Sequence, residues 1–273
     1  MQSIRTTSLK GTPLEFEFRD SPFQQSQFFL ALHKSGSVLF YNIVEELADA
    51  CGKPHFALET ELFSRGVALV DCPLELTQIL EKPGYIFHGF RTQWILNYVR
   101  QFRTSRKLLL VRDPRDIAVS YYFSVTKSHT IPESGDVREK MLDQRRAANE
   151  IDVNTFVRSG RCDFVLANMR AFMRLVETDP NCRVYRYEDV IFKKREWVAD
   201  IAKVCGLDAG IDKINEIADR HDIRPDKENP DAHIRQVTPG NFRQHLDEAA
   251  QNSLEKRFEP VFRYFKYEPE TLG

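Results

Sequence analysis

The stretch FFLALHKSGSVLFYNIVEELADACG, residues 28–52, joins an apolar run to a helical pattern through small and basic residues. The run at 28–32 is typical of a buried strand, and the apolar spacing over 39–47 is typical of one helix face. Between them stands Lys-Ser-Gly-Ser, residues 34–37. The free N–H groups and positive dipole end of a helix, a lysine and two hydroxyls can together bind a phosphate. The junction is therefore predicted to be an anion-binding loop, with an ordinary tight turn as the alternative.

The order of residues in this junction separates it from the nucleotide-binding P-loop. That motif has Gly-Lys-Ser/Thr after an earlier glycine, whereas here Lys34 precedes Gly36. The pattern therefore favours a P-loop-like phosphate loop of another kind.

Composition narrows the class of protein. With 273 residues, 42% of them hydrophobic, the chain can form a substantial core in one large domain or two small ones. It has no run of about 18 apolar residues and no basic-then-apolar leader, so we expect a cytoplasmic protein without a membrane span. A net charge of -1 argues against a nucleic-acid partner. Five scattered cysteines without zinc-type spacing indicate reduced thiols, and no metal is expected.

Further strands are predicted at 84–90, 107–111 and 182–190, with helical patterns between them, one of them at 94–99. Strands separated by helices of 10 to 15 residues indicate an α/β fold with three α/β/α layers around a central parallel sheet. Sites in such folds lie at the carboxyl ends of the strands.

Four candidate site residues, Lys34, His88, Arg112 and Tyr187, stand at or just past predicted strand ends. The carboxyl ends of parallel strands share one edge of a sheet. We therefore expect these four side chains to lie along one edge.

The chain is interpreted as a single domain, residues 1–273. Residues 1–26 show weak patterning and are treated as an N-terminal extension. Residues 222–241 contain prolines and charges with little periodicity, which indicates a long functional loop or a disordered segment.

A second informative stretch is LLLVRDPRDIAVSYYFS, residues 108–124. Arg112 ends a strand, and Asp113 followed by Pro114 is typical of a helix N-cap with proline at N1. Ser120 comes two turns into that helix, on the side that could face the same phosphate as Arg112.

Together with HKSGS, this stretch resembles the sulfotransferases that use 3'-phosphoadenosine 5'-phosphosulfate (PAPS). In that family a Lys-Ser-Gly-Thr-Thr loop after the first strand binds the 5'-phosphosulfate. An Arg-Asp/Asn-Pro-x-Asp strand end, with a serine eight residues after the arginine, binds the 3'-phosphate. IRQVTPGNFRQHL, residues 234–246, resembles the loop that covers the nucleotide in this family. The resemblance extends over roughly residues 27–267.

The resemblance implies a role for each matching residue. The 5' group would be held by Lys34, Ser35, Gly36, Ser37 and Val38. The 3'-phosphate would be held by Arg112, Ser120 and Arg235, and Tyr187 would lie near the adenine. The catalytic residues would be Lys34, which stabilises the leaving phosphate, and His88, the general base, which stands 24 residues before Arg112.

The sequence also departs from the family pattern. Val38 replaces a threonine. Leu39 replaces a tryptophan that often stacks on the adenine, and Phe40 is a candidate to stack there instead. Gln236 stands where lysine is usual, and Phe242 replaces a second tryptophan. The dimerisation pattern of animal cytosolic members has no match, so the oligomeric state is open.

The resemblance implies transfer of a sulfuryl group from PAPS to a hydroxyl, with an amine as second choice, of a small-molecule, glycan or lipid acceptor. The product nucleotide would be the 3',5'-bisphosphate. Two alternatives stay open: a P-loop-type small-molecule kinase and a catalytically silent nucleotide-binding protein. The absence of Gly-Lys-Ser/Thr and of an obvious magnesium ligand near the loop counts against the kinase.

Overall fold

A computed structural model of the chain describes residues 2–128, 131–133, 136–225 and 236–267. The strands are β1 (Gln2–Thr7), β2 (Pro13–Phe18), β3 (Gln27–Ala31), β4 (His55–Phe56), β5 (Ile86–Phe90), β6 (Arg106–Val111) and β7 (Cys182–Arg186). The α-helices are α1 (Ser37–Ala50), α2 (Leu58–Ser64), α3 (Pro114–Phe123), α4 (Asp136–Asn149), α5 (Val153–Arg158), α6 (Asp163–Thr178), α7 (Tyr187–Val190), α8 (Lys194–Cys205), α9 (Ile211–Arg220) and α10 (Glu248–Tyr264). Short 3-10 segments are η1 (Leu69–Asp71), η2 (Leu74–Glu81), η3 (Ile95–Tyr98), η4 (Gln101–Arg103) and η6 (Asn241–Gln244), and η5 (Ser124–Ser128) is a π-helical turn.

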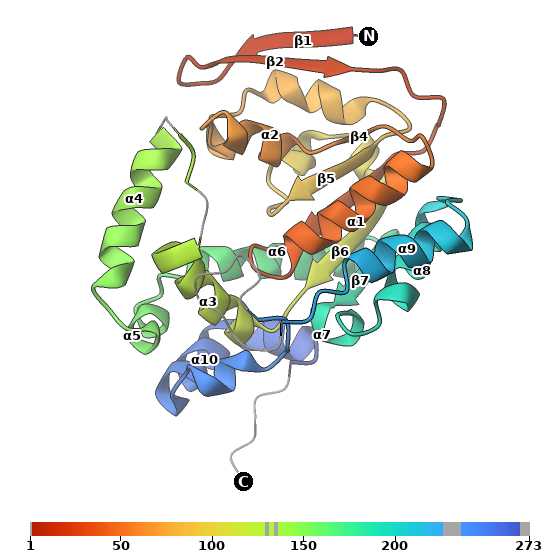
Figure 1. The fold of residues 1–273 in the computed structure, drawn as a ribbon. Coiled ribbons are helices and arrows are strands. Elements are labelled where there is room, and N and C mark those ends of the chain that lie inside the picture. The colour runs from red at the N-terminus through yellow and green to blue at the C-terminus, as the bar shows by residue number, and fades with distance from the viewer. Residues whose placement is uncertain (1, 129–130, 134–135, 226–235, 268–273) are drawn as a thin grey trace.

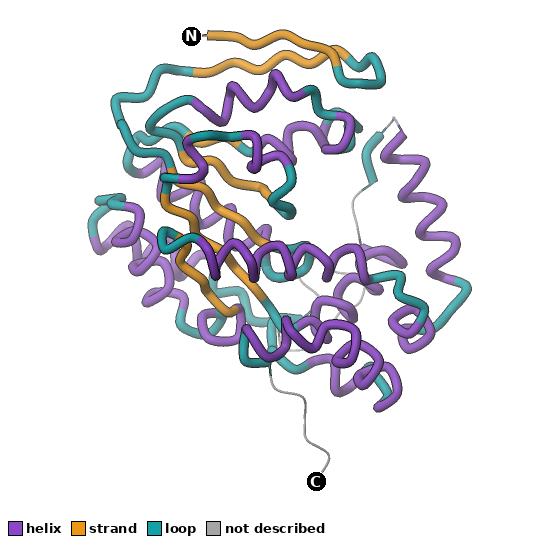
Figure 2. Tube along the Cα trace, turned by 180° about the vertical axis from the view of Figure 1, so that it is seen from behind, coloured by secondary structure: helices purple, strands orange, loops and turns teal. Residues whose placement is uncertain are grey.

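Among the described residues, five strands form one parallel sheet in the order β4-β5-β3-β6-β7 (Figure 1). Helices lie on both of its faces, as the view from behind also shows (Figure 2). The three-layer α/β/α fold expected from the sequence is therefore confirmed.

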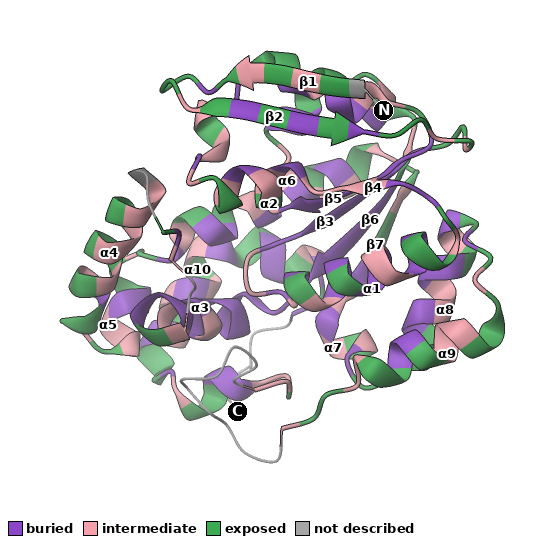
Figure 3. Ribbon diagram, turned by 45° about the horizontal axis from the view of Figure 1, so that its top comes forward, coloured by how far each residue is buried: buried purple, intermediate pink, exposed green. Residues whose placement is uncertain are grey.

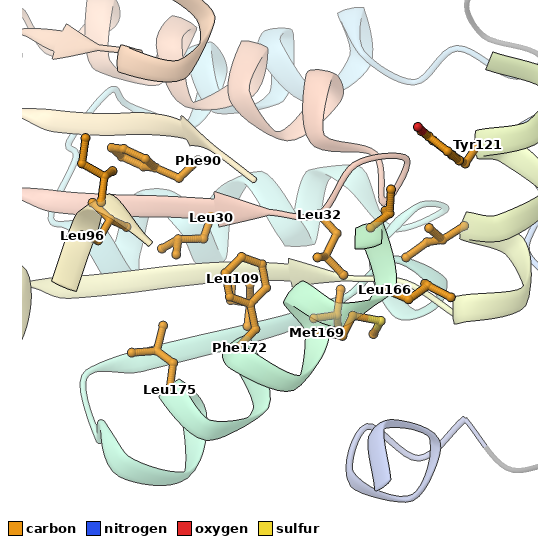
Figure 4. Packing of buried hydrophobic residues seen from close by; sticks show 14 of the residues in the cluster. Leu30, Leu32, Phe90, Leu96, Leu109, Tyr121, Leu166, Met169, Phe172 and Leu175 are labelled. Carbon is orange, nitrogen blue, oxygen red and sulfur yellow. The ribbon is translucent and has the colours of Figure 1, made fainter. Parts of the chain in front are cut away.

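The two faces of the sheet belong to two separate hydrophobic clusters, because side chains alternate along a strand. Phe29 and Leu108 point to the face covered by α1, α8 and α9. Leu30 and Leu109 point to the opposite face, where Phe172 and other apolar residues of α6 pack on them (Figure 4). Strands β3, β5 and β6 are buried along nearly their whole length, as expected for a parallel sheet covered on both sides, whereas the edge strands β4 and β7 are partly exposed (Figure 3).

Strand β5 contains an irregularity directly after the pair formed by Phe87. Phe28 of β3 pairs with Phe87, but Leu30 pairs with Phe90, so β5 has one extra residue across the same length of β3. Gly89 has a φ of 86°, which only glycine adopts readily. Phe87 and Phe90 thus both point to the α6 face, and the ring of His88 lies 5.7 Å from that of Tyr41 in α1.

Three sequence expectations need correction. His88 is the middle residue of β5 and does not end the strand. The segment at 94–99 forms the 3-10 turn η3 instead of an α-helix. Part of the N-terminal segment forms an antiparallel hairpin, β1 with β2, whose apolar residues alternate along β2.

The hairpin packs on the same core cluster as the sheet. The Phe16 and Phe18 rings lie 5.7 and 5.1 Å from the ring of Phe56 in β4, and all three phenylalanines belong to that cluster or pack against it. No helix within the described ranges is long and apolar enough to cross a membrane.

The core contact between α6 and the sheet can be tested by truncation. Phe172→Ala should lower the free energy of unfolding by about 3–5 kcal/mol, because Phe172 is fully buried against the sheet and a cavity would remain. Urea denaturation measures this value. The matched control on the same helix is Phe164→Ala, where the ring is 55% exposed, and its effect should be roughly 0.5 kcal/mol. Equal losses in both variants would contradict the packing described here.

Candidate functional site

Three loops meet at the carboxyl edge of the sheet. Lys34 follows β3, Arg112 follows β6 directly, and Tyr187 is the first residue after β7. The Arg112 guanidinium donates a hydrogen bond to the Lys34 carbonyl at 3.4 Å and lies 4.4 Å from the centre of the Tyr187 ring. The structure thus brings together three of the four residues expected at this edge.

The loop after β3 has an unusual backbone. Lys34 has a φ of 65° and Gly36 a φ of 90°, so two residues adopt the left-handed conformation within one turn. A Cβ at Gly36 would lie 2.9 Å from two ring carbons of Tyr187, which makes glycine necessary there. The buried Ser35 hydroxyl donates to the Leu32 carbonyl at 2.8 Å and holds the turn in place.

This backbone leaves the start of α1 available to an anion. Gly36 is the N-cap of α1, and within the described chain no side chain caps the helix and no acidic residue stands in its first turn. The first backbone N–H groups, those of Ser37 and Val38 among them, have no acceptor inside the helix. A helix N-terminus with free N–H groups and no competing carboxylate favours a bound phosphate.

The Lys34 side chain extends to Ser124, the first residue of η5, which directly follows α3. Its Nζ donates to the Ser124 hydroxyl at 3.2 Å, and Ser124 is buried at the start of η5. Ser124 was missed in the sequence, where nothing marks it except its position at the end of the helix that Arg112 precedes. The contact fixes the lysine ammonium group beside the start of η5.

Arg112 is buried, with 5% of its surface exposed, and remains charged. It donates to Asp116 Oδ2 at 3.3 Å. Burial opposes the charge, but Asp116, Tyr187 and Glu188 outweigh it and raise the pKa of Arg112 above its usual value. Its Nε is buried and has no hydrogen-bond partner among the described residues. A buried charged donor without a partner is costly, and an anionic ligand would satisfy it. Ser120 is partly exposed on α3 two turns after this arginine.

Asp116 holds the C-terminal loop to this edge. The side chain is 1% exposed, and its two oxygens accept hydrogen bonds from Gly240 N at 2.8 Å and Phe242 N at 2.9 Å. Asp113, by contrast, is the helix cap that was expected, because it accepts from Arg115 N at 2.8 Å.

The C-terminal loop has two more anchors. The Tyr187 hydroxyl donates to the Val237 carbonyl at 3.0 Å, and the Phe242 ring centre lies 4.1 Å from the guanidinium of Arg115. Residues 226–235, which include Arg235 and half of the loop expected at 222–241, lie outside the described residues. Phe40 is fully buried and stacked on Trp197, so it belongs to the core and does not form a platform at this edge.

The fourth candidate, His88, lies apart from the other three. It is 1% exposed in the body of β5, and its Nε2 lies 3.3 Å from Nδ1 of His55 and 3.4 Å from a carboxylate oxygen of Glu45. Burial, followed by the charges of His55 and Arg91, lowers the pKa of His88 to about 3. The expectation that its side chain reaches the carboxyl edge is therefore corrected.

Comparison with known proteins identifies the family to which the chain belongs. A family model described as a sulfotransferase domain matches residues 99–266, more than half of the chain. The structure of mouse sulfotransferase SULT7A1 complexed with PAP aligns with a TM-score of 0.55 and 13% sequence identity, over 89% of this chain and 87% of that one. At this identity the likeness concerns the fold alone.

Two structures of retinol dehydratase also align. The complex with androsterone and the inactive cofactor PAP has a TM-score of 0.45 at 15% identity, over 87% of this chain and 80% of that one. The complex with retinol and PAP has a TM-score of 0.46 at 15% identity, over 88% and 82%. A search of curated protein sequences gave no match.

The role of Asp116 gives a structural prediction. Asp116→Asn replaces one acceptor oxygen by an NH₂ group, so one buried N–H of the C-terminal loop loses its partner and the contact with Arg112 weakens. An unsatisfied buried group costs about 1–3 kcal/mol. Hydrogen exchange followed by mass spectrometry should show faster exchange at Gly240 and Phe242, together with a lower melting temperature. The control is the exposed Asp189→Asn, and unchanged exchange in the Asp116 variant would contradict the anchoring role.

Proposed function

Because the chain belongs to the sulfotransferase domain family, we propose that it transfers a sulfuryl group from PAPS to a hydroxyl of a small acceptor. An amine is the second choice of acceptor group. The observation that carries this proposal is the convergence of an uncapped helix start, Lys34 and the buried Arg112 at one edge of the sheet. That arrangement supplies two separate places for anionic groups, as a 3',5'-bisphosphate nucleotide requires.

The 5' end of the nucleotide is proposed to bind at the start of α1. What supports this is the positive-φ turn, which leaves the N–H groups of Ser37 and Val38 unpaired within the helix. Ser35 is proposed to hold the shape of the turn, since its hydroxyl and its backbone N–H both donate to the Leu32 carbonyl. The valine at position 38 can contribute only its backbone N–H, because its side chain has no hydroxyl.

The 3'-phosphate is proposed to bind at Arg112 and Ser120. The support is the unpaired buried Nε of Arg112 and the position of Ser120 on the helix that starts beside it. Arg235 is proposed as a further ligand of the 3'-phosphate, because its loop resembles the loop that covers the nucleotide in this family. Tyr187, placed by the resemblance near the adenine, has a buried ring beneath Arg112, so we propose that it fixes the direction of the guanidinium.

PAPS supplies a sulfuryl group that is already activated by its bond to the 5'-phosphate. The protein then has to align the acceptor and stabilise the negative charge that grows on the leaving phosphate. Lys34 and the N-terminus of α1 are proposed to stabilise that charge. Ser124, which accepts from Lys34 Nζ, positions the ammonium group for this role.

That His88 is the general base stays a prediction, and its position gives it little support. A general base must come within hydrogen-bond distance of the proton that it removes. His88 is buried in the middle of β5, where its Nε2 faces Glu45 and His55. We therefore propose that proton removal does not depend on His88 in this conformation.

The reaction class can be tested directly by mass spectrometry of acceptor mixtures incubated with PAPS or with ATP. A sulfotransferase adds a sulfuryl group only with PAPS. Phosphoryl transfer from ATP would favour the kinase alternative. Binding of the bisphosphate nucleotide without turnover of any phenol, alcohol, sugar or lipid would favour a silent nucleotide-binding protein.

Arg112 should discriminate between nucleotides. Arg112→Ala should weaken binding of the 3',5'-bisphosphate by about tenfold to a hundredfold, because charge-assisted hydrogen bonds contribute roughly 1.5–3 kcal/mol. Affinity for the 5'-monophosphate should hardly change. Calorimetry on folded protein measures both values, with the exposed Arg183→Ala as control. An equal loss for both nucleotides would place the 3'-phosphate elsewhere.

Lys34 should matter more to the transition state than to binding of the product. Lys34→Ala should lower kcat by more than about tenfold, the change that corresponds to 1.4 kcal/mol in the barrier, while affinity for the product nucleotide changes less. Steady-state kinetics measures kcat, and calorimetry measures the affinity for the product nucleotide. Lys203→Ala, an exposed lysine of α8, is the control. Turnover within tenfold of the parent would show that the loop has another role.

A further inference from the structure

A second cluster of functional groups lies on the α1 face of the sheet, at its β4 edge. It contains Glu45 of α1, His55 of β4 and His88 of β5, and one ligand atom from each lies within 4.8 Å of the others. The three residues are brought together by the fold, since His55 pairs in parallel register with Ile86, two residues before His88. Glu45 lies eight residues into α1, about 12 Å along the helix from the phosphate loop. The cluster is therefore separate from the nucleotide site.

Two of the three distances between ligand atoms in this cluster fit a tetrahedral metal ion. Nε2 of His88 lies 3.3 Å from Nδ1 of His55 and 3.4 Å from Oε1 of Glu45. In a tetrahedral zinc site with bonds of 2.0–2.1 Å, two ligand atoms are about 3.3 Å apart. Two imidazole nitrogens and one carboxylate oxygen are ligands that zinc prefers, whereas magnesium and calcium favour oxygen alone.

The surroundings of the cluster also suit a metal. Nε2 of His55 lies 3.4 Å from a carboxylate oxygen of Asp49, one turn after Glu45 on α1. A carboxylate that accepts from the second ring nitrogen fixes the tautomer in which the first nitrogen is free to ligate. The Glu45 and His55 side chains are 39% and 29% exposed, so an ion and a water molecule can enter from solvent.

We propose that Glu45, His55 and His88 form a zinc site with water as the fourth ligand. The ion would connect the two-residue edge strand β4 to β5 and to the middle of α1. Its role is to stabilise this edge of the sheet. This site would also occupy the lone pair of His88 Nε2, so ligation and a general-base role for that nitrogen exclude each other.

The experiment is a titration of the full chain with ZnCl₂ after treatment with EDTA, followed by calorimetry and thermal melting. We expect one zinc per chain and a melting temperature that rises with zinc but not with MgCl₂, because a ligand that binds only the folded state stabilises it. Glu45→Gln, His55→Gln and His88→Asn should each weaken binding at least tenfold. The matched control is Glu46→Gln, the next residue of α1, whose carboxylate pairs with Arg220 and His221 instead.

Cobalt substitution identifies the ligands. Co²⁺ at the proposed site should give visible absorption of a tetrahedral nitrogen and oxygen site without the strong near-ultraviolet band of cysteine thiolates. A thiolate band would overturn the proposal, since it would place the ion on one of the five free cysteines. Zinc binding that is absent, or equal in the Glu45, His88 and Glu46 variants, would overturn it as well. None of these measurements depends on sulfuryl transfer. Failure of the zinc proposal and failure of the proposed function can therefore be distinguished.

Discussion

The buried carboxylate of Asp116 is the contact on which the arrangement of the nucleotide edge depends. Two backbone N–H groups of the C-terminal loop and the guanidinium of Arg112 donate to its two oxygens. A buried charge is stable only when it is paired and its hydrogen-bonding capacity is filled. One side chain of α3 thereby fixes a loop more than a hundred residues away in sequence and orients the arginine proposed to bind the 3'-phosphate.

Tyr187 connects the same edge to the loop after β3. Its ring lies against Gly36 on one side and beneath Arg112, and its hydroxyl donates to the C-terminal loop. The left-handed conformation of Gly36 and the absence of its Cβ let this ring approach the loop so closely. Backbone conformation and aromatic packing thus hold the start of α1 open toward solvent, where an anion could bind.

The sequence predicted the parts of the site that depend on short segments. The lysine loop, Arg112 and Tyr187 each follow a strand that is recognisable from its own apolar run, and parallel strands necessarily bring such positions to one edge. His88 was misplaced because β5 continues beyond it to Phe90, which leaves His88 in the middle of the strand. The hairpin of β1 and β2 was also missed, although the alternation of Leu14, Phe16 and Phe18 is visible in the sequence.

By itself the sequence determined the α/β class, the positions of β3, β5, β6 and β7 and the place of the lysine-containing loop after β3, because each follows from local periodicity or from the order of a few adjacent residues. Only the tertiary structure decided which distant groups meet. Asp116 reaches Gly240 and Phe242, and Glu45 reaches His55 and His88, through packing between elements that no spacing in the chain encodes. Such contacts depend on strand order and register, which are set by long-range packing and not by neighbours in sequence.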